Sequence, residues 1–267
     1  MDSRAFLYDN LRFWERRRRM YPVHKKLLPF TYKGTACSDV NDLWQAPEFS
    51  ANDRLLDIGC GVGNTLITLA KRIGLGGAGI SISAAEVEAA RQNAVEAGVA
   101  ERCSFICASF EAPFQSSFTR AIAIESIKHS HNLRATAAHI FSQATTGARF
   151  FLIDDCYTGN REGTQEKSLM KDWALSRLYA AVDFISAFTD AGFVHVEDTD
   201  LTAQIIPRSA FFLQLKIFFF GLMLKLPLGK VRSNLLSVYR SGFVLEKLFA
   251  EKKMEYRLLV FRRPSEA

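Results

Sequence analysis

Residues 54–65, Arg-Leu-Leu-Asp-Ile-Gly-Cys-Gly-Val-Gly-Asn-Thr, constrain this chain more than any other stretch. A short apolar run breaks into Gly59, Gly61 and Gly63, after which apolar residues recur at helical spacing. The pattern predicts a strand, a tight glycine turn and a helix. Glycine lets a ligand lie directly on the backbone, and the first N–H groups of the helix face that ligand. We therefore expect a nucleotide-like ligand at this turn.

The spacing of the glycines narrows the choice of ligand. Asp57 precedes the first glycine by two positions, so the turn is D-x-G-x-G-x-G and departs from the dinucleotide fingerprint G-x-G-x-x-G. A P-loop is excluded because no Gly-Lys-Ser/Thr follows. The turn resembles motif I of the class I S-adenosylmethionine (SAM) methyltransferases, whose cationic sulfonium ligand makes a nearby acid favourable. An accidental glycine-rich turn in an α/β protein is the alternative.

This resemblance implies a fold and a division of the chain. The expected fold is α/β, with three layers around a Rossmann-like, seven-stranded mixed sheet whose last strand is antiparallel. The methyltransferase domain would cover residues 46–267, with cap elements at about 158–180 and 201–251, and residues 1–45 would form an N-terminal helical lid. The cap at 158–180 would end in a helix that includes Trp173 and Leu178. The motif I residues implied to bind SAM are Asp57, Gly59, Cys60, Gly61, Asn64 and Thr65.

Composition sets broader limits. The 267 residues are 48% hydrophobic and 23% charged, as in an ordinary globular protein of one α/β domain. Five cysteines are an odd number and include no C-x-x-C pair, which argues against a disulfide framework and against a zinc site. The first residues lack the basic and apolar pattern of an export signal, so we expect a cytoplasmic protein.

The second and third predicted strands depart from the usual class I pattern. Residues 79–83, Gly-Ile-Ser-Ile-Ser, resemble the subgroup of cyclopropane synthases and of tocopherol, sterol and prenyl diphosphate C-methyltransferases. Ser81, followed by Ile82, stands where most class I enzymes have an acid for the ribose. We expect Glu86 to take the ribose hydroxyls, although it could instead serve only the capping box Ser83-x-x-Glu86. After the third strand the family's acid is also absent, which leaves Ser109 and Phe110 as the expected adenine contacts.

The fourth predicted strand ends in Glu-Ser-Ile-Lys-His at residues 125–129. This resembles the Glu-Ser-x-Glu-His of tocopherol methyltransferases, except that Lys128 replaces the second acid, so we do not expect cyclopropanation. Ligands of open α/β sheets bind beyond the carboxyl ends of the strands, which places Glu125 beside the reacting carbon. Glu125 could stabilise positive charge or accept a proton. His129, with a reference pKa near ~6.5, is the alternative base, and a loop-ordering role is the alternative for Glu125.

Several residues are expected to contact the acceptor. Asp154 and Asp155 end the fifth predicted strand on the same rim as Glu125 and would hold Mg²⁺ with it only if the acceptor were a diphosphate; a solvated turn is their alternative role. No other metal is expected. The predicted acceptor contacts, from the N-terminal lid, the fifth strand and the caps, are Tyr8, Trp14, Tyr21, His24, Asp154, Tyr157, Trp173 and Phe211.

Residues 210–229 form a phenylalanine-rich segment of nearly membrane-spanning length. Lys216 and Lys225 interrupt it and Pro227 closes it, so we interpret it as a buried or interfacial helix. Residues 210–226 could form a lipophilic lid, a dimer surface, a peripheral membrane contact or simply part of the core. A homo-oligomer is compatible with this interpretation.

These features together predict a SAM-dependent methyltransferase of secondary metabolism that acts on a lipophilic small molecule. We expect carbon methylation of an isoprenoid-like (terpenoid) acceptor, with a subsequent cation rearrangement quenched at Glu125 or His129. The first alternative is O- or N-methylation of a polyketide, phenol or amine with His129 as base. RNA methylation, suggested by the net charge of +6, ranks lower because no RNA-binding module is evident, so we expect no nucleic acid partner. A SAM-binding protein without turnover is the last alternative.

Overall fold

A computed structural model describes residues 49–265 except 113–115, 160–162, 206 and 228. The predicted N-terminal lid, residues 1–45, lies outside the described residues. The strands are β1 (Arg54–Ile58), β2 (Gly76–Ser81), β3 (Cys103–Cys107), β4 (Phe118–Ile124), β5 (Ala144–Tyr157), β6 (Val194–Asp200) and β7 (Met254–Arg262). The main helices are α5 (Asn64–Ile73), α6 (Ala84–Glu96), α7 (Leu133–Gln143), α8 (Thr164–Asp172), α9 (Ala181–Asp190), α10 (Ala210–Met223) and α11 (Lys230–Ala250).

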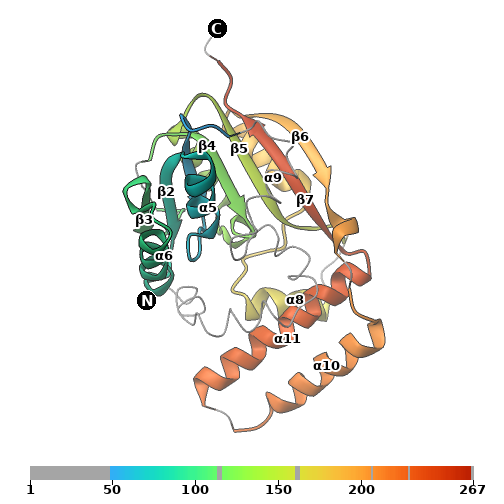
Figure 1. Ribbon diagram of the computed structural model, residues 1–267. Helices are drawn as coiled ribbons and strands as arrows, with labels where there is room; N and C mark the ends of the chain where they lie inside the picture. The colour runs from blue at the N-terminus through green and yellow to red at the C-terminus, as the bar shows by residue number, and fades with distance from the viewer. Residues whose placement is uncertain (1–48, 113–115, 160–162, 206, 228, 266–267) are drawn as a thin grey trace.

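The strands form one seven-stranded sheet in the order β3-β2-β1-β4-β5-β7-β6 (Figure 1). β1 pairs in parallel with β2 and β4, and β4 with β5, whereas β7 runs antiparallel to both β5 and β6. This is the mixed sheet with an antiparallel last strand that the sequence predicts. Strand order reverses at β1 and β4, so a ligand site is expected where their carboxyl ends diverge.

Helices cover both faces of the sheet because the central strands are apolar on both sides. On β5, Phe150 points into a core shared with α7 and α9, and its neighbour Phe151 points into a core shared with α5, α6 and α11. Both phenylalanines are at most 1% exposed. The alternation of strand side chains thus builds two separate cores and gives the three-layer arrangement.

Two elements differ in extent from the sequence prediction. β5 continues beyond Asp155, where the fifth predicted strand ends, because β7 pairs with it as far as Tyr157 opposite Met254. The predicted helix through Trp173 and Leu178 is wrong at its end. α8 stops at Asp172, and Ala174 takes a left-handed backbone with φ 52°, so residues 173–180 follow as an irregular segment.

α8, α10 and α11 lie together at the lower end of the view in Figure 1, apart from α5 and α6. Two buried acids join these helices: Asp172 of α8 accepts hydrogen bonds from Arg240 and Ser241 of α11, and Glu246 of α11 pairs with Arg208 just before α10. No helix in the described part of the chain is long and apolar enough to cross a membrane.

Candidate active site

The glycine turn after β1 combines two uses of glycine. Gly59, Gly61 and Gly63 all have positive φ, at 79°, 53° and 81°. A Cβ on Gly59 would lie 2.4 Å from the Cβ of Ser126, and one on Gly63 would lie 2.8 Å from the Phe105 ring. Among the described residues, a Cβ on Gly61 would meet nothing closer than Oε1 of Glu86 at 3.9 Å. The outer two glycines are therefore required by packing, whereas Gly61 borders space that a ligand can occupy.

Neighbouring elements hold the turn in place. The N–H groups of Gly59 and Cys60 both donate to the carbonyl of Ile80 in β2, each at 2.9 Å. The Asn93 amide of α6 donates to the carbonyl of Val62 at 3.0 Å. The turn is thus preorganised by contacts within the chain itself. Asn64 and Thr65 begin α5 directly behind it, Asn64 half-buried and Thr65 buried.

Asp57 lies beneath the turn and is 3% exposed. Its Oδ2 atom has no hydrogen-bond partner within the described residues. Burial raises the pKa of Asp57 to about 7, while the backbone N–H of Leu66 acts in the opposite direction. A buried carboxylate with an unused oxygen is stabilised by a nearby cation, which is the arrangement that the sequence predicts for this acid.

The residues after β2 form a short polar chain. The Ser81 hydroxyl donates to Oε2 of Glu86 at 2.7 Å, and the backbone N–H of Glu86 donates to Ser83 Oγ at 3.1 Å. Ser83 therefore caps α6, while Ser81 orients the Glu86 carboxylate, whose other oxygen lies toward Gly61. Glu86 is 7% exposed, and Ile82 beside it is half-buried. The carboxylate thus lies opposite the open side of the glycine turn.

The predicted adenine contacts lie just after β3. Ser109 Oγ accepts a hydrogen bond from the backbone N–H of Glu111 at 3.2 Å, which fixes this turn. Phe110 is 8% exposed and belongs to the core that α7 and α9 share with the sheet. The acid that follows, Glu111, accepts from the backbone of Asn132 at the start of α7. Only Ser109 of the predicted pair is half-exposed.

Glu125 follows β4 in a strained conformation, with φ 52° for a residue that is not glycine. Its N–H donates to the Ile153 carbonyl at 2.8 Å, and its Oε1 accepts from the Tyr256 hydroxyl at 3.0 Å. Burial, and next the Glu125 charge, raise the pKa of Tyr256 well above its ordinary value, so the phenol stays protonated and donates. Tyr256 comes from β7 and carries no local motif, so sequence reasoning missed it.

Lys128 is a second residue to which the sequence analysis gave no role in the site, although it placed the residue on this rim of the sheet. Its backbone N–H donates to Asp154 at 3.0 Å, and its ammonium lies 3.3 Å from Asp154 Oδ1 and bonds to Asp155. All three residues are at most 6% exposed, so the interpretation of the two aspartates as a solvated turn is wrong. Burial acts to lower the pKa of Lys128, but Asp155, Asp154 and Glu125 outweigh it and raise that pKa.

The Lys128 ion pair also bears on the conditional Mg²⁺ site. The ammonium occupies the position between the two aspartates where a cation would be held. Among the described residues, no group of three or more His, Cys, Asp or Glu side chains is arranged to hold a metal ion. His129, the alternative base, is 9% exposed at the end of a short turn, η3 (Ile127–His129). Its backbone N–H donates to the Ser126 carbonyl at 3.1 Å.

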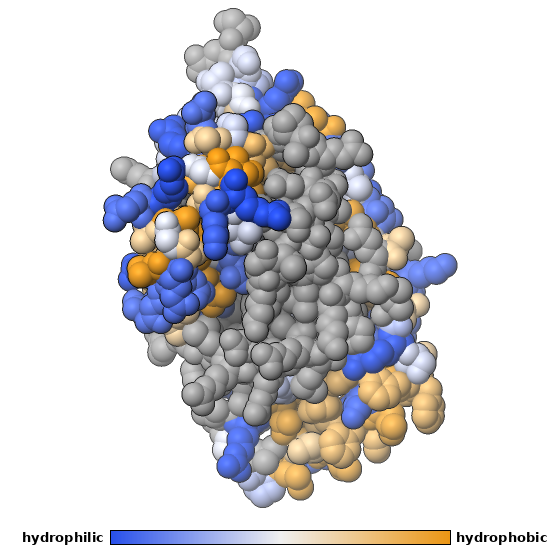
Figure 2. Space-filling model, viewed as in Figure 1, coloured by the Kyte–Doolittle hydropathy of each residue, from blue (hydrophilic) through white to orange (hydrophobic). Residues whose placement is uncertain are grey.

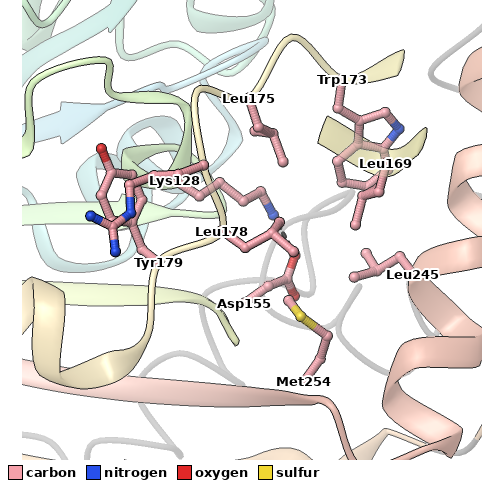
Figure 3. Close-up of a pocket in the computed structure, with 10 residues that line it drawn as sticks. Lys128, Asp155, Leu169, Trp173, Leu175, Leu178, Tyr179, Leu245 and Met254 are labelled. Atoms are coloured by element: carbon pink, nitrogen blue, oxygen red, sulfur yellow. Dashed lines mark hydrogen bonds and ion pairs between the residues drawn. The ribbon is translucent and has the colours of Figure 1, made fainter. Parts of the chain in front are cut away.

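A pocket opens beside this ion pair (Figure 3). Lys128 and Asp155 form its polar end, and the Trp173 ring lies 5.5 Å from the Lys128 ammonium. The remaining walls come from α8, the segment after it, α11 and β7, and are mostly apolar. They consist of Leu169, Leu175, Arg177, Leu178, Tyr179, Leu245 and Met254.

The structure brings together only part of the predicted acceptor contacts. Trp173 lines the pocket and Asp154 pairs with the pocket residue Lys128, whereas Tyr157 is buried at the end of β5, with its hydroxyl against Gly159. Phe211 is 81% exposed on α10, away from α5 and the glycine turn in Figure 1. The other four predictions, Tyr8, Trp14, Tyr21 and His24, lie outside the described residues.

The chain matches the methyltransferase domain family over residues 31–197 and belongs to that family. The fold and the glycine turn are those of the class I SAM-dependent methyltransferases, which confirms the resemblance seen in the sequence. In solved structures, the geranyl diphosphate C-methyltransferase from Streptomyces coelicolor A3(2), in complex with Mg²⁺, geranyl diphosphate and S-adenosyl-L-homocysteine, has a TM-score of 0.65 at 16% identity, covering 85% of this chain and 79% of that one. The [4+2]-cyclase SpnF also has a TM-score of 0.65, at 19% identity, covering 93% of this chain and 95% of that one.

Sequence relatives differ in what their names describe. Methyltransferase phqN from Penicillium fellutanum is 30% identical over 159 residues, 57% of this chain and 49% of the relative. 24-Methylenesterol C-methyltransferase 2 from Oryza sativa subsp. japonica is 34% identical over 113 residues, 42% of this chain and 30% of the relative. Norajmaline N-methyltransferase from Rauvolfia serpentina is 27% identical over 164 residues, which are 57% of this chain and 56% of the relative. The matched segments cover at most 56% of these three relatives.

Proposed function

We propose that this protein transfers the methyl group of SAM to a lipophilic small molecule, and that the acceptor atom is carbon in an isoprenoid-like compound. When bound, SAM supplies an electrophilic methyl group on a positively charged sulfur. The residues of the turn fit it: Gly61 leaves open space, and Asp57 offers a buried oxygen with no partner in the described chain. Glu86, oriented by Ser81, is proposed to accept hydrogen bonds from the ribose hydroxyls.

The remaining proposed SAM contacts are the turn and helix-start residues Gly59, Cys60, Asn64 and Thr65, together with Ile82, Ser109 and Phe110 around the adenosine. Glu125 lies at the carboxyl end of β4, next to β1, and is therefore proposed to face both SAM and the acceptor. Its strained backbone is consistent with a functional position, because such strain persists only where surrounding contacts enforce it.

The pocket beside Lys128 carries the proposal of a lipophilic acceptor. Five aliphatic side chains and Trp173 line it, so an apolar body can displace water there. Lys128, Asp155 and Arg177 are the charged residues that line the pocket, and Glu125 and Asp154 lie close enough to Lys128 to raise its pKa. The Glu125 and Asp155 carboxylates can stabilise an acceptor that becomes positively charged, whereas Lys128 already occupies the position between the two aspartates that a Mg²⁺ ion would need. We therefore propose an acceptor that lacks a diphosphate and needs no Mg²⁺.

The residues then have distinct roles in carbon methylation. An alkene that accepts a methyl group develops a carbocation, which the Glu125 carboxylate can stabilise and then deprotonate. The Tyr256 hydroxyl holds this carboxylate in place. Rearrangement of the cation before proton loss is compatible with an apolar pocket that excludes water. Most of the rate would come from positioning and from exclusion of water.

The decisive experiment is product analysis after incubation with isotopically labelled SAM and a panel of isoprenoid, sterol, phenolic and amine acceptors. NMR of the product locates the labelled methyl group. Methyl on carbon, with turnover lost in Glu125→Gln while SAM binding is retained by calorimetry, supports the proposal. Methyl on oxygen or nitrogen in every product would overturn the carbon assignment but leave methyl transfer intact. SAM binding without turnover on any acceptor would favour a non-catalytic SAM-binding protein.

N-methylation is the second candidate, favoured by the Asp155 carboxylate at the polar end of the pocket. The protonated form of an amine acceptor would be attracted to Asp155. A base would have to remove that proton before methyl transfer, and His129 is the candidate. Loss of turnover in His129→Ala with full retention in Glu125→Gln would favour this candidate over carbon methylation.

A further inference from the structure

The outer face of α10 carries an uncovered apolar stripe. Phe211, Leu215, Phe218 and Leu222 recur at the i, i+4, i+7, i+11 spacing of one helix face. They are 81%, 51%, 68% and 54% exposed, respectively. These four residues are called the α10 stripe, and they form part of the apolar surface at the lower right of Figure 2. Contiguous exposed apolar surface of this kind marks an interaction site in a soluble domain.

The fold already uses the opposite face of the same helix. Leu213 is fully buried, and Phe220 stacks on Tyr239 at 6.1 Å and packs on Phe243 at 5.6 Å between ring centroids, both in α11. Residues two apart on a helix point about 200° apart, so Leu213 and Leu215 face opposite ways. Packing against α11 therefore explains the inner apolar face and leaves the α10 stripe unexplained.

The sequence that flanks the α10 stripe carries charge of one sign. Residues 201–245 contain six Lys and Arg and no Asp or Glu. Arg208 and Arg240 are paired with Glu246 and Asp172. Lys216, Lys225 and Arg232 make no ion pair with an acid in the described part of the chain, and these cations remain available to an anionic partner.

We propose that the α10 stripe inserts into the interfacial region of an anionic lipid membrane, with α10 parallel to the surface and its neighbouring cations on the lipid headgroups. α10 has 14 residues and is about 21 Å long, too short to cross a hydrocarbon core of about 30 Å. Exposed phenylalanine and leucine flanked by lysine match the chemistry of interfacial helices. A second copy of the chain fits less well, because a symmetric contact would bring the same cations together.

Vesicle binding tests this inference without any acceptor, so its outcome is independent of the proposed function. The full chain is mixed with phosphatidylcholine vesicles, with or without about 30% phosphatidylserine, and the bound fraction is measured by flotation. We expect binding that requires phosphatidylserine and weakens as salt rises. The double variant Phe218→Ser/Leu222→Ser should bind at least about tenfold more weakly, because two large apolar side chains no longer insert.

A matched control replaces two exposed valines elsewhere on the surface, Val95 on α6 and Val182 on α9, which are 67% and 66% exposed. Val95→Ser/Val182→Ser should bind vesicles like the unaltered chain. A further variant, Lys216→Glu/Lys225→Glu, should lose the preference for phosphatidylserine. Equal binding by all variants, or no binding by the unaltered chain, would overturn the inference. Light scattering gives one more contrary outcome. If the unaltered chain self-associates, does not bind vesicles, and becomes monomeric in Phe218→Ser/Leu222→Ser, the inference is also overturned.

Discussion

The Tyr256 hydroxyl donates a hydrogen bond to Glu125 Oε1 at 3.0 Å, across 131 positions of the chain. Tyr256 is fully buried in β7, whereas Glu125 is half-buried in the strained turn after β4. β7 does not pair with β4, so the bond reaches over β5, which lies between them. The contact ties the carboxylate with the proposed catalytic role to a buried side chain of β7, two strands away in the sheet.

Removal of this hydroxyl should affect catalysis more than stability. We expect Tyr256→Phe to lower the free energy of unfolding by about 1 kcal/mol, the usual net contribution of one hydrogen bond. The methyl transfer rate should fall several-fold at unchanged SAM affinity, because Glu125 loses its orientation. Denaturant unfolding, calorimetry and kcat measure the three quantities. Thr145→Val, which removes a bond of 3.0 Å to the Phe118 carbonyl, is the matched control and should leave kcat unchanged. Equal kcat in both variants would remove Tyr256 from the mechanism.

Alanine variants of the glycine turn can separate the effect of packing on stability from the effect of ligand space on SAM binding. Gly59→Ala, Gly61→Ala and Gly98→Ala each place a side chain on a left-handed residue, which costs roughly 1–2 kcal/mol. No described residue lies close to a Cβ built on Gly98, so its variant measures this strain alone. The free energy of unfolding of Gly59→Ala should fall by about 1–3 kcal/mol more than that of Gly98→Ala, because its Cβ collides with Ser126.

Gly61→Ala should be as stable as Gly98→Ala but should lose at least about tenfold in SAM affinity, because its Cβ enters the proposed ligand space. Thermal unfolding and calorimetry separate the two effects. SAM binding at full strength in Gly61→Ala would show that the ligand does not lie on this residue.

Asp57 should make SAM binding depend on pH. Its pKa is raised from 3.8 to about 7 by burial. Between these values the folded chain keeps a proton that the unfolded chain releases, so this group makes the free energy of unfolding fall as pH rises through that window. A cation binds better to the ionised form. The dissociation constant of SAM should therefore fall as pH rises from about 6 to about 8.

S-adenosylhomocysteine, which lacks the sulfonium charge, should show a weaker pH dependence, and Asp57→Asn should flatten the SAM profile. Circular dichroism checks that the variant is folded. An identical profile for SAM in Asp57→Asn would assign the pH dependence to another group.

Local sequence pattern predicted the glycine turn well, because a strand, a turn and a helix follow one another within 20 residues, from Arg54 to Ile73. The Ser81–Glu86 pair was also within reach, since it spans one turn between adjacent elements. Even so, the sequence could not show that the Ser81 hydroxyl donates to the carboxylate, because that depends on the rotamers of two buried side chains.

Contacts between distant strands were out of reach for a different reason. Tyr256 meets Glu125 only because the register of β5 and β7 is fixed, and nothing local in β7 encodes that register. Lys128 was visible as a departure from the family pattern. Its partners follow from the parallel pairing of β4 with β5, which brings Lys128 and Asp155 to one edge of the sheet. The sequence analysis placed both on that edge and did not pair them.

The Lys128 ion pair therefore gives the strictest test of the site. Lys128→Met should destabilise the fold by about 3–5 kcal/mol, because Asp154 and Asp155 are left buried without a counter-charge. The loss should shrink at acidic pH, where the unpaired acids take up protons more readily. Lys128→Met/Asp154→Asn/Asp155→Asn removes all three charges and should recover most of the stability, since the buried charge is gone. Denaturant unfolding at about pH 5 and pH 8 compares the variants. A loss below about 1 kcal/mol in Lys128→Met would mean that water reaches the two aspartates and screens them.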